Sequence, residues 1–412
     1  MNLVADHKIE SAKMSRNATL SANEQNHFRR YLGYASSILT AYNGAEPFHL
    51  YLKKYFSVHK KHGSRDRKYI TSLCYNFFRL GFGAADNSGI EDKLLLATFL
   101  LENKPSSLLQ SLSPDWDEKI HLSLHEKLLI TEEFFNINKL FLLQSELSPE
   151  VDPVQFSESF LKQPKLYIRI RPGHYETVIH KLNAACILYE NLSETCLAFT
   201  NNLKVSDILK IDEEAVVQDY SSQRVGEFFK VQTIGKSPIS IWDCCAASGG
   251  KSILAYDTLK DIKLTVSDKR KSILKNLDAR FAKAGIKEYD SFIADLSADS
   301  FNLQGKTFDF IIADVPCSGS GTWARTPEQL KFFRKEKITE YALLQQQIVS
   351  NAIPSLIKGG FLLYITCSVF KKENEENVDF IQRNLNLQLI KSDYLKGYQM
   401  QADTLFGALF RK

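Results

Sequence analysis

The sequence predicts an α/β fold in which a doubly wound, mostly parallel sheet follows an all-helical domain and a small α+β module. The prediction rests on three observations. After residue 239, apolar runs of strand length alternate with longer helical segments up to the end of the chain. From about residue 28 to 150, apolar residues recur instead at helical spacing. The 412 residues exceed the length of one ordinary domain, so we expect the three parts to be separate domains.

The composition is typical of a globular protein, with 44% hydrophobic and 24% charged residues. The seven cysteines show neither disulfide-like spacing nor a C-x-x-C pair, which indicates a reducing compartment and no structural zinc. The amino terminus contains no hydrophobic signal core and no transmembrane run. We therefore expect a cytoplasmic protein with no metal site and no membrane partner.

The first 25 residues are polar and expected to be flexible, and residues 26–150 are expected to form the helical domain. One helix of this domain is expected to have Ser64 as its cap and to bury an apolar stripe. The stripe consists of Ile70, Leu73, Cys74 and Phe77.

Basic residues cluster between residues 51 and 80, opposed by the single acid Asp66. They are Lys53, Lys54, Lys60, Lys61, Arg65, Arg67, Lys68 and Arg79. Such a cluster predicts a surface for a polyanion, although a solvated helix face explains it equally well.

Residues 155–235 are expected to form the small α+β module. Residues 166–171 alternate apolar and basic side chains, and residues 175–185 have the pattern of a helix. Arg169 and Arg171 could grip RNA backbone from an exposed strand face, but an ordinary half-buried strand fits the pattern as well.

The last part, residues 236–412, supplies the sheet. Its strands are expected at 239–244, 264–266, 291–294, 308–313, 361–365, 387–390 and 405–410. Its helices are expected at 251–259, 271–284, 338–357 and 374–384, the third one ended by Gly359 and Gly360. Because crossovers are right-handed, this order gives a parallel doubly wound sheet, to which the terminal strands could add an antiparallel edge.

A glycine-rich loop follows the first strand, with the sequence Ala-Ala-Ser-Gly-Gly-Lys-Ser from Ala246 to Ser252. Glycines at a strand-to-helix turn let the backbone approach a ligand, and the start of the helix offers unpaired N–H groups. A phosphate loop of the form G-x-x-x-x-G-K-[ST] would need its first glycine at Cys245, so we exclude nucleoside triphosphate hydrolysis.

Three acids stand just beyond strands, namely Asp268, Asp295 and Asp314. Each of them alone would often be only a helix cap. Three acids around one crevice favour ligand binding, for example by accepting hydrogen bonds from ribose hydroxyls or from an adenine amine.

Two cysteines also follow strands. Cys317 lies in the segment Asp-Val-Pro-Cys-Ser-Gly-Ser-Gly from Asp314 to Gly321, and Cys367 lies in Tyr-Ile-Thr-Cys-Ser from residue 364 to 368. Each strand would deliver its cysteine to the same crevice of the sheet. A free cysteine is usually a small buried hydrophobe, but the shared placement makes that interpretation the weaker one.

Residues 218–412 resemble the RsmB/Nop/Sun family of RNA cytosine-5 methyltransferases, and its bacterial RsmB-like members in particular. Three motifs carry the resemblance: Asp-Cys-Cys-Ala-Ala-Ser-Gly-Gly-Lys at 243–251, Asp-Val-Pro-Cys-Ser-Gly-Ser-Gly at 314–321 and Thr-Cys-Ser at 366–368. The resemblance implies a Rossmann-like class I methyltransferase domain. More weakly, Gly-Ser-Arg-Asp-Arg at 63–67 resembles the NusB-like helical domain of bacterial members. The family usually has proline where this chain has Ser248, a difference that could loosen the cofactor loop.

The resemblance implies S-adenosylmethionine as the cofactor and a role for each matching residue. The implied cofactor site consists of Cys245, Ala246, Ala247, Ser248, Gly249, Gly250 and Lys251 with Asp268, Asp295 and Asp314. Cys367 would add to carbon 6 of a cytosine, Cys317 would assist the elimination, and Asp314 would hydrogen-bond the pyrimidine edge. Lys251 could lower a thiol pKa or orient Asp314, or it could be a helix-surface lysine.

The implied substrate is RNA, with 16S ribosomal RNA as the first candidate. The target cytosine must be single-stranded or flipped out, because a stacked base cannot meet a thiol and a methyl donor together. Trp323 and Arg325, which follow the Cys317 loop, could contact RNA, although packing under that loop explains Trp323 equally well. Three alternatives remain: a transfer RNA cytosine-5 methyltransferase, a methyltransferase for an exocyclic amine, and a catalytically silent RNA-binding assembly factor. We expect the chain to act as a monomer.

Overall fold

The computed structural model describes residues 22–230, 237–259, 261–298, 301, 303 and 305–412. The segment 1–25, predicted to be flexible, lies almost entirely outside these residues. The chain divides into two compact units: Met1–Leu142 with Thr326–Phe332, and Leu143–Arg325 with Phe333–Lys412. Within the described ranges, no helix is both long enough and apolar enough to cross a membrane.

The first unit is built from helices around one core rich in aromatic side chains, as the apolar spacing predicts. Its elements are α2 (Ala22–Ala41), α3 (Phe48–Val58), α4 (Ser64–Arg79), α5 (Ile90–Leu101), α6 (Ser107–Leu112), α7 (Pro114–Glu118), α8 (Leu124–Ile130), η2 (Ile137–Lys139) and α15 (Gln329–Phe332). The core contains Phe48, Ile70 and Phe78, and Phe332 of α15 packs against it. A short segment from between the two cysteine motifs therefore belongs to the helical unit.

The cap of helix α4 is Gly63 and not Ser64, so that prediction is wrong. The carboxylate of Asp66 accepts a hydrogen bond from the Gly63 N–H at 3.1 Å and another from the Tyr31 hydroxyl at 2.6 Å. An acid in the first turn thus satisfies an amide group that the helix start leaves without a partner, and no serine cap is needed. The predicted apolar stripe is confirmed, since Ile70, Leu73, Cys74 and Phe77 are all buried.

The second unit begins with a four-stranded antiparallel sheet in the order β2-β3-β1-β4. The elements of this part are η3 (Gln144–Glu146), α9 (Pro153–Phe160), β1 (Leu166–Ile170), α10 (Tyr175–Ala184), β2 (Glu190–Asn191), β3 (Cys196–Phe199), η4 (Val205–Asp207), β4 (Ala215–Val217), α11 (Tyr220–Arg224) and α12 (Gly226–Phe229). A strand and a helix therefore lie where the alternating pattern and the helical pattern predict them.

Arg169 in β1 and Arg171 just after it are buried, so the interpretation as an exposed RNA-gripping face is wrong. Arg169 Nη1 and Arg171 Nη2 each lie 2.7 Å from a carboxylate oxygen of Asp257, on helix α13 (Gly250–Leu259). Arg171 Nη1 also donates to the backbone oxygens of Asp212 at 3.1 Å and Ala284 at 2.7 Å. The two arginines therefore join the small module to the helix that follows the glycine loop.

We expect Asp257→Ala to lower the melting temperature by roughly 10 °C, since removing one partner of a buried ion pair costs about 3–5 kcal/mol. The substitution leaves two buried guanidinium groups without their carboxylate. Scanning calorimetry measures the shift. Asp290→Ala is the control, because its 3.3 Å pair with Lys306 is exposed. An exposed pair contributes at most about 1 kcal/mol. Equal shifts for the two variants would contradict the role given to Asp257.

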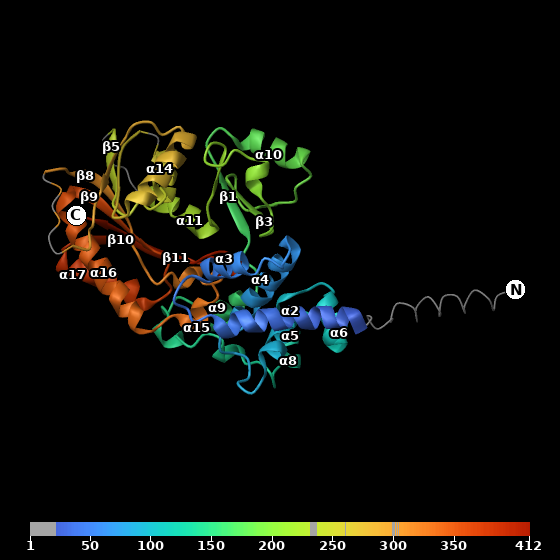
Figure 1. The fold of residues 1–412 in the computed structure, drawn as a ribbon. Coiled ribbons are helices and arrows are strands. Elements are labelled where there is room, and N and C mark those ends of the chain that lie inside the picture. The colour runs from blue at the N-terminus through green and yellow to red at the C-terminus, as the bar shows by residue number, and fades with distance from the viewer. Residues whose placement is uncertain (1–21, 231–236, 260, 299–300, 302, 304) are drawn as a thin grey trace. The chain divides into compact units, whose positions relative to one another are not determined.

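The large sheet has seven strands in the order β10-β11-β9-β8-β5-β6-β7 (Figure 1). The strands are β5 (Ile239–Asp243), β6 (Ile262–Asp268), β7 (Tyr289–Ile293), β8 (Phe308–Asp314), β9 (Leu356–Thr366), β10 (Gln388–Leu395) and β11 (Leu405–Arg411). Besides α13, the helical elements are α14 (Lys271–Ala284), η5 (Ser320–Thr322), α16 (Glu336–Ala352), η6 (Ile353–Ser355), η7 (Lys371–Glu373), α17 (Glu375–Asn384) and η8 (Tyr398–Met400).

The predicted mostly parallel, doubly wound sheet is confirmed. Strands β5 to β9 pair in parallel, whereas β11 pairs antiparallel with both β9 and β10. The two terminal strands thus form the expected antiparallel edge of the sheet, with β11 inserted between β9 and β10.

Strand β9 begins at Leu356, five residues before the predicted start, and helix α16 correspondingly ends at Ala352. Gly359, with φ +80°, and Gly360 lie inside the strand, next to an irregularity in its pairing with β8. A glycine tolerates the positive φ of such a bulge because it has no side chain to clash. Glycine is equally common after helices, which is why the prediction placed the helix end there.

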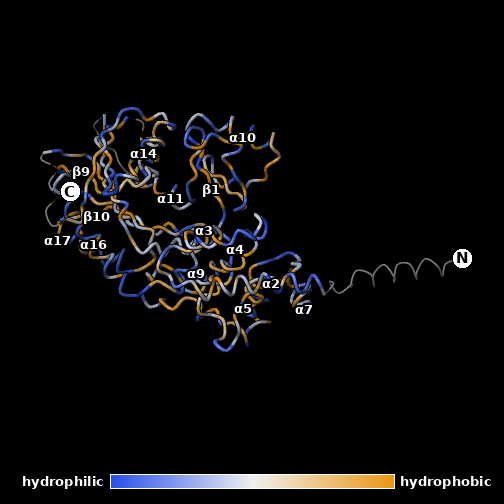
Figure 2. The backbone as a smooth tube through the Cα atoms, viewed as in Figure 1, coloured by the Kyte–Doolittle hydropathy of each residue, from blue (hydrophilic) through white to orange (hydrophobic). Residues whose placement is uncertain are grey.

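Alternate residues of β9 contact different helical layers. Leu363 and Ile365 lie in a core that contains Phe281 of α14. Tyr364, between them, donates a hydrogen bond at 2.9 Å to Gln345 of α16. The sheet is therefore covered on both faces, and Figure 1 shows α14 and α16 on opposite sides of it. Figure 2 shows the hydrophobic character of strands such as β9 that this covering requires.

Candidate active site

A cavity of about 460 Å³ opens at the carboxyl ends of the parallel strands, where the strand order reverses at β5. This is the position at which doubly wound sheets bind ligands, and the volume is typical of a small-molecule site. The predicted site residues in its wall are Cys245, Ala247, Asp268, Asp295, Asp314, Cys317 and Cys367. The structure thus brings together residues that are more than 100 positions apart in the chain.

The glycine loop turns sharply because Ala247 and Gly249 both have positive φ, +46° and +83°. A Cβ at Gly249 would lie 2.6 Å from the ring of Phe281, so only glycine fits there without a shift of that ring. The Ala247 N–H donates to Asp268 Oδ2 at 3.1 Å, which ties the loop to the end of β6. The other predicted members of the loop, Ala246, Ser248, Gly250 and Lys251, form the turn into α13.

Ser248, which departs from the family pattern, is held by Arg280 of α14. Arg280 Nη1 donates to the backbone oxygen of Ser248 at 2.9 Å and to its hydroxyl oxygen at 3.1 Å. The same guanidinium pairs with Asp212 of the small module at 2.8 Å. The serine therefore does not leave the loop unsupported, because it gains a hydrogen bond that a proline could not accept with its side chain.

Asp268 and Asp295 are placed differently in the cavity wall. Asp268 is buried and accepts hydrogen bonds from the backbone and side chain of Arg270 at 2.9 and 3.1 Å. Asp295 is exposed, and the hydroxyl and the amide of Ser297 both donate to it and hold its pKa below the usual range. The oxygens of both side chains could accept hydrogen bonds from a ligand hydroxyl.

Lys251 and Asp314 form an ion pair at the cavity, with Lys251 Nζ 2.9 Å from Asp314 Oδ2. Lys251 is buried, so the interpretation as a helix-surface lysine is wrong. Burial alone would lower the pKa of Lys251, but the negative charges of Asp314 and Cys367 raise it above its usual range. A permanently cationic group thus stands next to both an acid and a thiol of the cavity.

The two cysteines predicted to face one crevice do so. Cys317 Sγ lies 3.2 Å from Cys367 Sγ, and the Cys367 N–H points at Cys317 Sγ at 3.3 Å. The hydrogen bond to Cys367, together with burial, raises the pKa of Cys317 well above its usual range. Cys317 is therefore held as a thiol at neutral pH, and either sulfur could donate the hydrogen bond between them.

Residues 236–406 match the family model described as 16S rRNA methyltransferase RsmB/F. They include the glycine loop, both cysteines and the three strand-end acids whose geometry is given above. This segment is an RsmB/F-family methyltransferase domain. The resemblance seen in the three motifs is thereby confirmed for this part of the chain.

Curated relatives of the RsmB/F domain carry the name ribosomal RNA small subunit methyltransferase B. The Shewanella oneidensis protein is 37% identical over 155 residues, which are 36% of this chain and 35% of the relative. The Xylella fastidiosa protein is 27% identical over 239 residues, 56% of this chain and 55% of the relative. The Serratia proteamaculans protein is 31% identical over 242 residues, which are 56% of this chain and 54% of the relative. The matched part of the chain thus spans about half or less of these relatives' length.

Solved structures support the fold. The protein PH0851 superposes with a TM-score of 0.65 at 19% identity, covering 96% of this chain and 100% of that chain. NSun6 from Pyrococcus horikoshii, solved with SFG, superposes with a TM-score of 0.54 at 17% identity, covering 63% of this chain and 94% of that chain. At these identities the likeness shows the fold alone.

S-adenosylmethionine is the cofactor of the RsmB/F domain, as the motifs predicted, and the cavity has the chemistry to hold it. Asp268 and Asp295 present acceptors at the ends of β6 and β7, where ribose hydroxyls need them. Leu296, Leu344 and Ile348 add an apolar wall against which an adenine ring can pack. The tight turn at Gly249 brings the loop backbone to the same cavity.

We expect Arg280→Met to raise the KM for S-adenosylmethionine about tenfold with kcat nearly unchanged, because the loop would lose support that acts on binding alone. Steady-state kinetics and calorimetric titration of the cofactor measure the two quantities. Arg383→Met is the matched control, since Arg383 is exposed and lies 3.9 Å from Asp379 on α17. A fall in kcat without a change in KM would show that Arg280 acts elsewhere.

The packing interpretation of Trp323 is confirmed, and Arg325, expected to contact RNA, forms ion pairs within the RsmB/F domain. Trp323 is buried between Phe333 and Phe370, with ring centroids 4.8 and 5.9 Å away. Arg325 pairs with Asp219 at 2.7 Å and Asp403 at 2.8 Å. Neither side chain is presented for stacking on a base.

A buried polar network beneath the cysteines was missed at the level of sequence. Its central members are Glu373 and Gln345, both completely buried, with Ser318 and Ser368 bonded to Glu373. The one available signal was an acid six residues after Cys367, at the start of the run Glu-Asn-Glu-Glu. Such a run is usually a solvated helix start, so nothing in it indicated burial.

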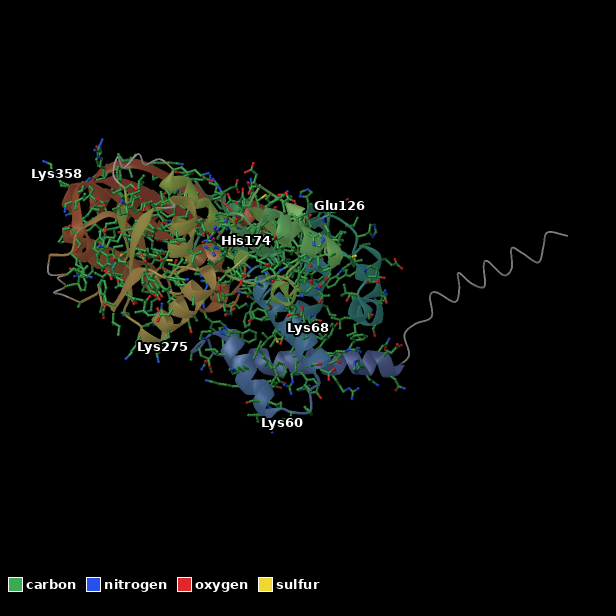
Figure 3. All side chains as sticks on the ribbon, turned by 90° about the horizontal axis from the view of Figure 1, so that it is seen from above. Lys60, Lys68, Glu126, His174, Lys275 and Lys358 are labelled. Carbon is green, nitrogen blue, oxygen red and sulfur yellow. The ribbon has the colours of Figure 1, made fainter. Side chains whose placement is uncertain are left out.

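The basic cluster of the first unit is mostly exposed. Its exposed members are Lys53, Lys54, Lys60, Lys61, Arg65 and Lys68. Figure 3 labels Lys60 and Lys68 of this group. Arg79 does not belong to it, because its side chain is buried in the last turn of α4, and Arg67 is turned back to donate to the His62 carbonyl at 2.8 Å. The remaining surface is suited to a polyanion.

Proposed function

We propose that this chain transfers a methyl group from S-adenosylmethionine to carbon 5 of a cytosine in RNA, through a covalent cysteine–cytosine adduct. The observation that supports this most is the pair of thiols, 3.2 Å apart, in the wall of the cofactor cavity. Methylation of an exocyclic amine needs no thiol at all. A pair of thiols in the wall of a methyltransferase cavity fits carbon methylation, where one sulfur must bond to the ring and another group must assist its release.

Cys367 is the proposed nucleophile. Its sulfur adds to carbon 6 of the ring, which makes carbon 5 electron-rich. Bound S-adenosylmethionine supplies the electrophilic methyl group. The cationic Lys251 stands near Cys367, where its charge would act on the negative sulfur as the addition proceeds. Asp314, fixed by Lys251 at 2.9 Å, would hydrogen-bond the pyrimidine edge and favour a proton on the ring nitrogen beside the amino group.

Cys317 is the proposed second group. After methyl transfer, carbon 5 carries both the methyl group and a proton, and the proton must leave before the bond from Cys367 to carbon 6 can break. Cys317 lies 3.2 Å from Cys367 and is therefore next to the ring in any adduct with Cys367. Once Cys317 has given its own S–H proton to solvent, its sulfur accepts the carbon 5 proton; the electrons of that C–H bond re-form the double bond between carbons 5 and 6, and the Cys367 sulfur leaves as a thiolate.

The proposed substrate is ribosomal RNA, since the curated relatives are named for the small subunit RNA. The exposed lysines and Arg65 of the first unit would bind phosphates of the RNA. The cytosine must be unstacked to reach the cavity. Transfer RNA is the alternative substrate, and both substrates involve the same proposed chemistry.

The test is methyl transfer from tritiated S-adenosylmethionine to unmodified small-subunit RNA and transfer RNA, followed by digestion and chromatography of the nucleosides. Tritium in 5-methylcytidine supports the proposal, and the RNA that is labelled identifies the substrate class. Label in an N-methylated nucleoside contradicts it. Absence of label, with the cofactor shown to bind, favours a silent assembly factor. Bisulfite sequencing of cells with and without the protein then locates the cytosine.

A further inference from the structure

Glu373, in η7, is a completely buried acid between the loops that carry the two cysteines. Its Oε2 accepts hydrogen bonds from the backbone N–H of Ser318 and from Gln345 Nε2, both at 2.9 Å. Its Oε1 accepts one from the hydroxyl of Ser368 at 2.7 Å. One carboxylate therefore receives three donors from three separate parts of the RsmB/F domain.

Two of those donors come from the residues that directly follow the cysteines. Ser318 follows Cys317 and Ser368 follows Cys367, so Glu373 links two loops that are 50 residues apart in the chain. The hydroxyls of Ser318 and Ser320 also lie 3.2 Å from that of Ser368. The separation of the two sulfur atoms is thus determined by bonds to a common acceptor rather than by the strands alone.

The network presents hydrogen-bond donors to this acid, and these donors oppose the rise in the pKa of Glu373 that burial causes. Gln345 is oriented by Tyr364 and Asn377, which donate to its Oε1 at 2.9 and 2.7 Å. Its Nε2 must therefore point at Glu373 and at the Pro316 carbonyl. Glu373 Oε2 consequently meets donors on both sides, and an acceptor-only group is the one that satisfies them. Burying an acid is costly unless hydrogen bonds compensate, so the three donors explain how it is retained.

The charges around the two sulfur atoms are unequal. The hydrogen bond to Cys367 and burial raise the pKa of Cys317, and the charge of Glu373 adds to that rise. Tyr341 of α16 also stands near Cys317, and Lys251 with Asp314 stands near Cys367. An acid on one side and a lysine on the other therefore give the two sulfur atoms different surroundings.

We propose that Glu373 is a positioning residue that holds the two cysteine loops together, so that Cys317 and Cys367 stay in unequal surroundings, Cys317 on the side of Glu373 and Cys367 on the side of Lys251. The inference rests on the proposed function, in which the two sulfurs have different duties, and it identifies the group that makes them different. Glu373 does not line the cavity, so it acts on the reaction only through the two loops.

The first test needs neither RNA nor cofactor. The ligand-free wild-type protein and Glu373→Gln are exposed to limiting iodoacetamide at pH 7.5, and peptide mass spectrometry gives the ratio of Cys317 to Cys367 labelling. Because thiolates react and thiols do not, we expect Cys367 to be labelled first in the wild type. Loss of the Glu373 charge should raise the ratio of Cys317 to Cys367 labelling at least about threefold. A fall of less than one unit in the pKa of Cys317 is enough to produce that change. An unchanged ratio overturns the proposal.

The matched control is Asp309→Asn. Asp309 is likewise a buried carboxylate that accepts a backbone N–H, from Ser240 at 2.9 Å, but it lies at the opposite end of β8 from the cavity. Replacing the Asp309 carboxylate by an amide should leave the ratio of Cys317 to Cys367 labelling unchanged. It should change the melting temperature by about as much as Glu373→Gln does. A ratio that rises equally in both variants would show a general loosening of the fold and would overturn the role of Glu373.

The second test is kinetic. Glu373→Ala is expected to lower the single-turnover rate of methyl transfer about 100-fold, the order of loss that a 1 Å misplacement of reacting groups causes, with the KM for S-adenosylmethionine within threefold of wild type. Glu373→Gln keeps the shape of the side chain, so its rate of methyl transfer should fall less. It replaces the alanine variant in this test if the alanine variant does not fold. If the wild type makes no 5-methylcytidine, the proposed function fails while the labelling ratio still decides the inference. If the wild type is active and the ratio is unchanged, the inference alone fails.

Discussion

Replacing Cys367 by alanine is expected to abolish methyl transfer, with a loss of at least about 1,000-fold in rate, and to leave no covalent protein–RNA complex. The reason is chemical: carbon 5 of cytosine is a weak nucleophile until a sulfur adds to carbon 6, and no other described side chain takes the position that Cys367 has beside Lys251. Tritium transfer measures the rate, and a denaturing gel with labelled RNA detects the adduct.

Cys186→Ala controls for the loss of a thiol as such, because Cys186 is exposed and lies in the small module. Cofactor binding to the Cys367 variant should remain within threefold of wild type, which shows that the cavity is intact. Residual transfer within tenfold of wild type would contradict the covalent mechanism. It would favour methylation of an exocyclic amine, for which the glycine loop and the acids suffice.

Most of the sheet could be predicted because its signals are local. Strand-length apolar runs and a helix such as Lys271–Ala284 have periodicities that burial on both faces imposes directly on the sequence. Two features escaped because they depend on neighbours far along the chain. Gly359 and Gly360 indicate a helix end when read locally, and only pairing with β8 makes them a bulge. The insertion of β11 between β9 and β10 is likewise a matter of tertiary pairing.

The candidate site likewise contains residues that local sequence signals predict and residues that only tertiary contacts explain. Cys317, Cys367 and the strand-end acids were found because each stands where a strand ends, a position that topology brings to one crevice. The alternation at Arg169 and Arg171 was ambiguous, since a buried arginine and an exposed one give the same pattern until Asp257 is seen opposite them. Glu373 was missed for the same reason: an acid is expected in solvent unless its donors are known.

Replacing Cys317 by alanine is expected to have the opposite signature from the Cys367 variant: turnover falls about 1,000-fold, yet the protein accumulates covalently bound to its RNA. Addition by Cys367 and methyl transfer do not need the second thiol, so the reaction should proceed as far as the methylated adduct. Removal of the proton from carbon 5 then lacks its assisting group, and the bond between Cys367 and carbon 6 persists. A denaturing gel of protein incubated with RNA and cofactor shows the shifted band.

The double variant with both cysteines replaced is the decisive control, because the shifted band should vanish with the nucleophile. Alanine at 317 also removes the sulfur that lies 3.2 Å from Cys367 Sγ. Adduct formation should nevertheless continue, because the nucleophile and Lys251 remain, while decay of the adduct becomes much slower. A Cys317 variant that turns over normally, or that forms no adduct while Cys367 remains reactive to iodoacetamide, would contradict this division of roles between the two sulfurs.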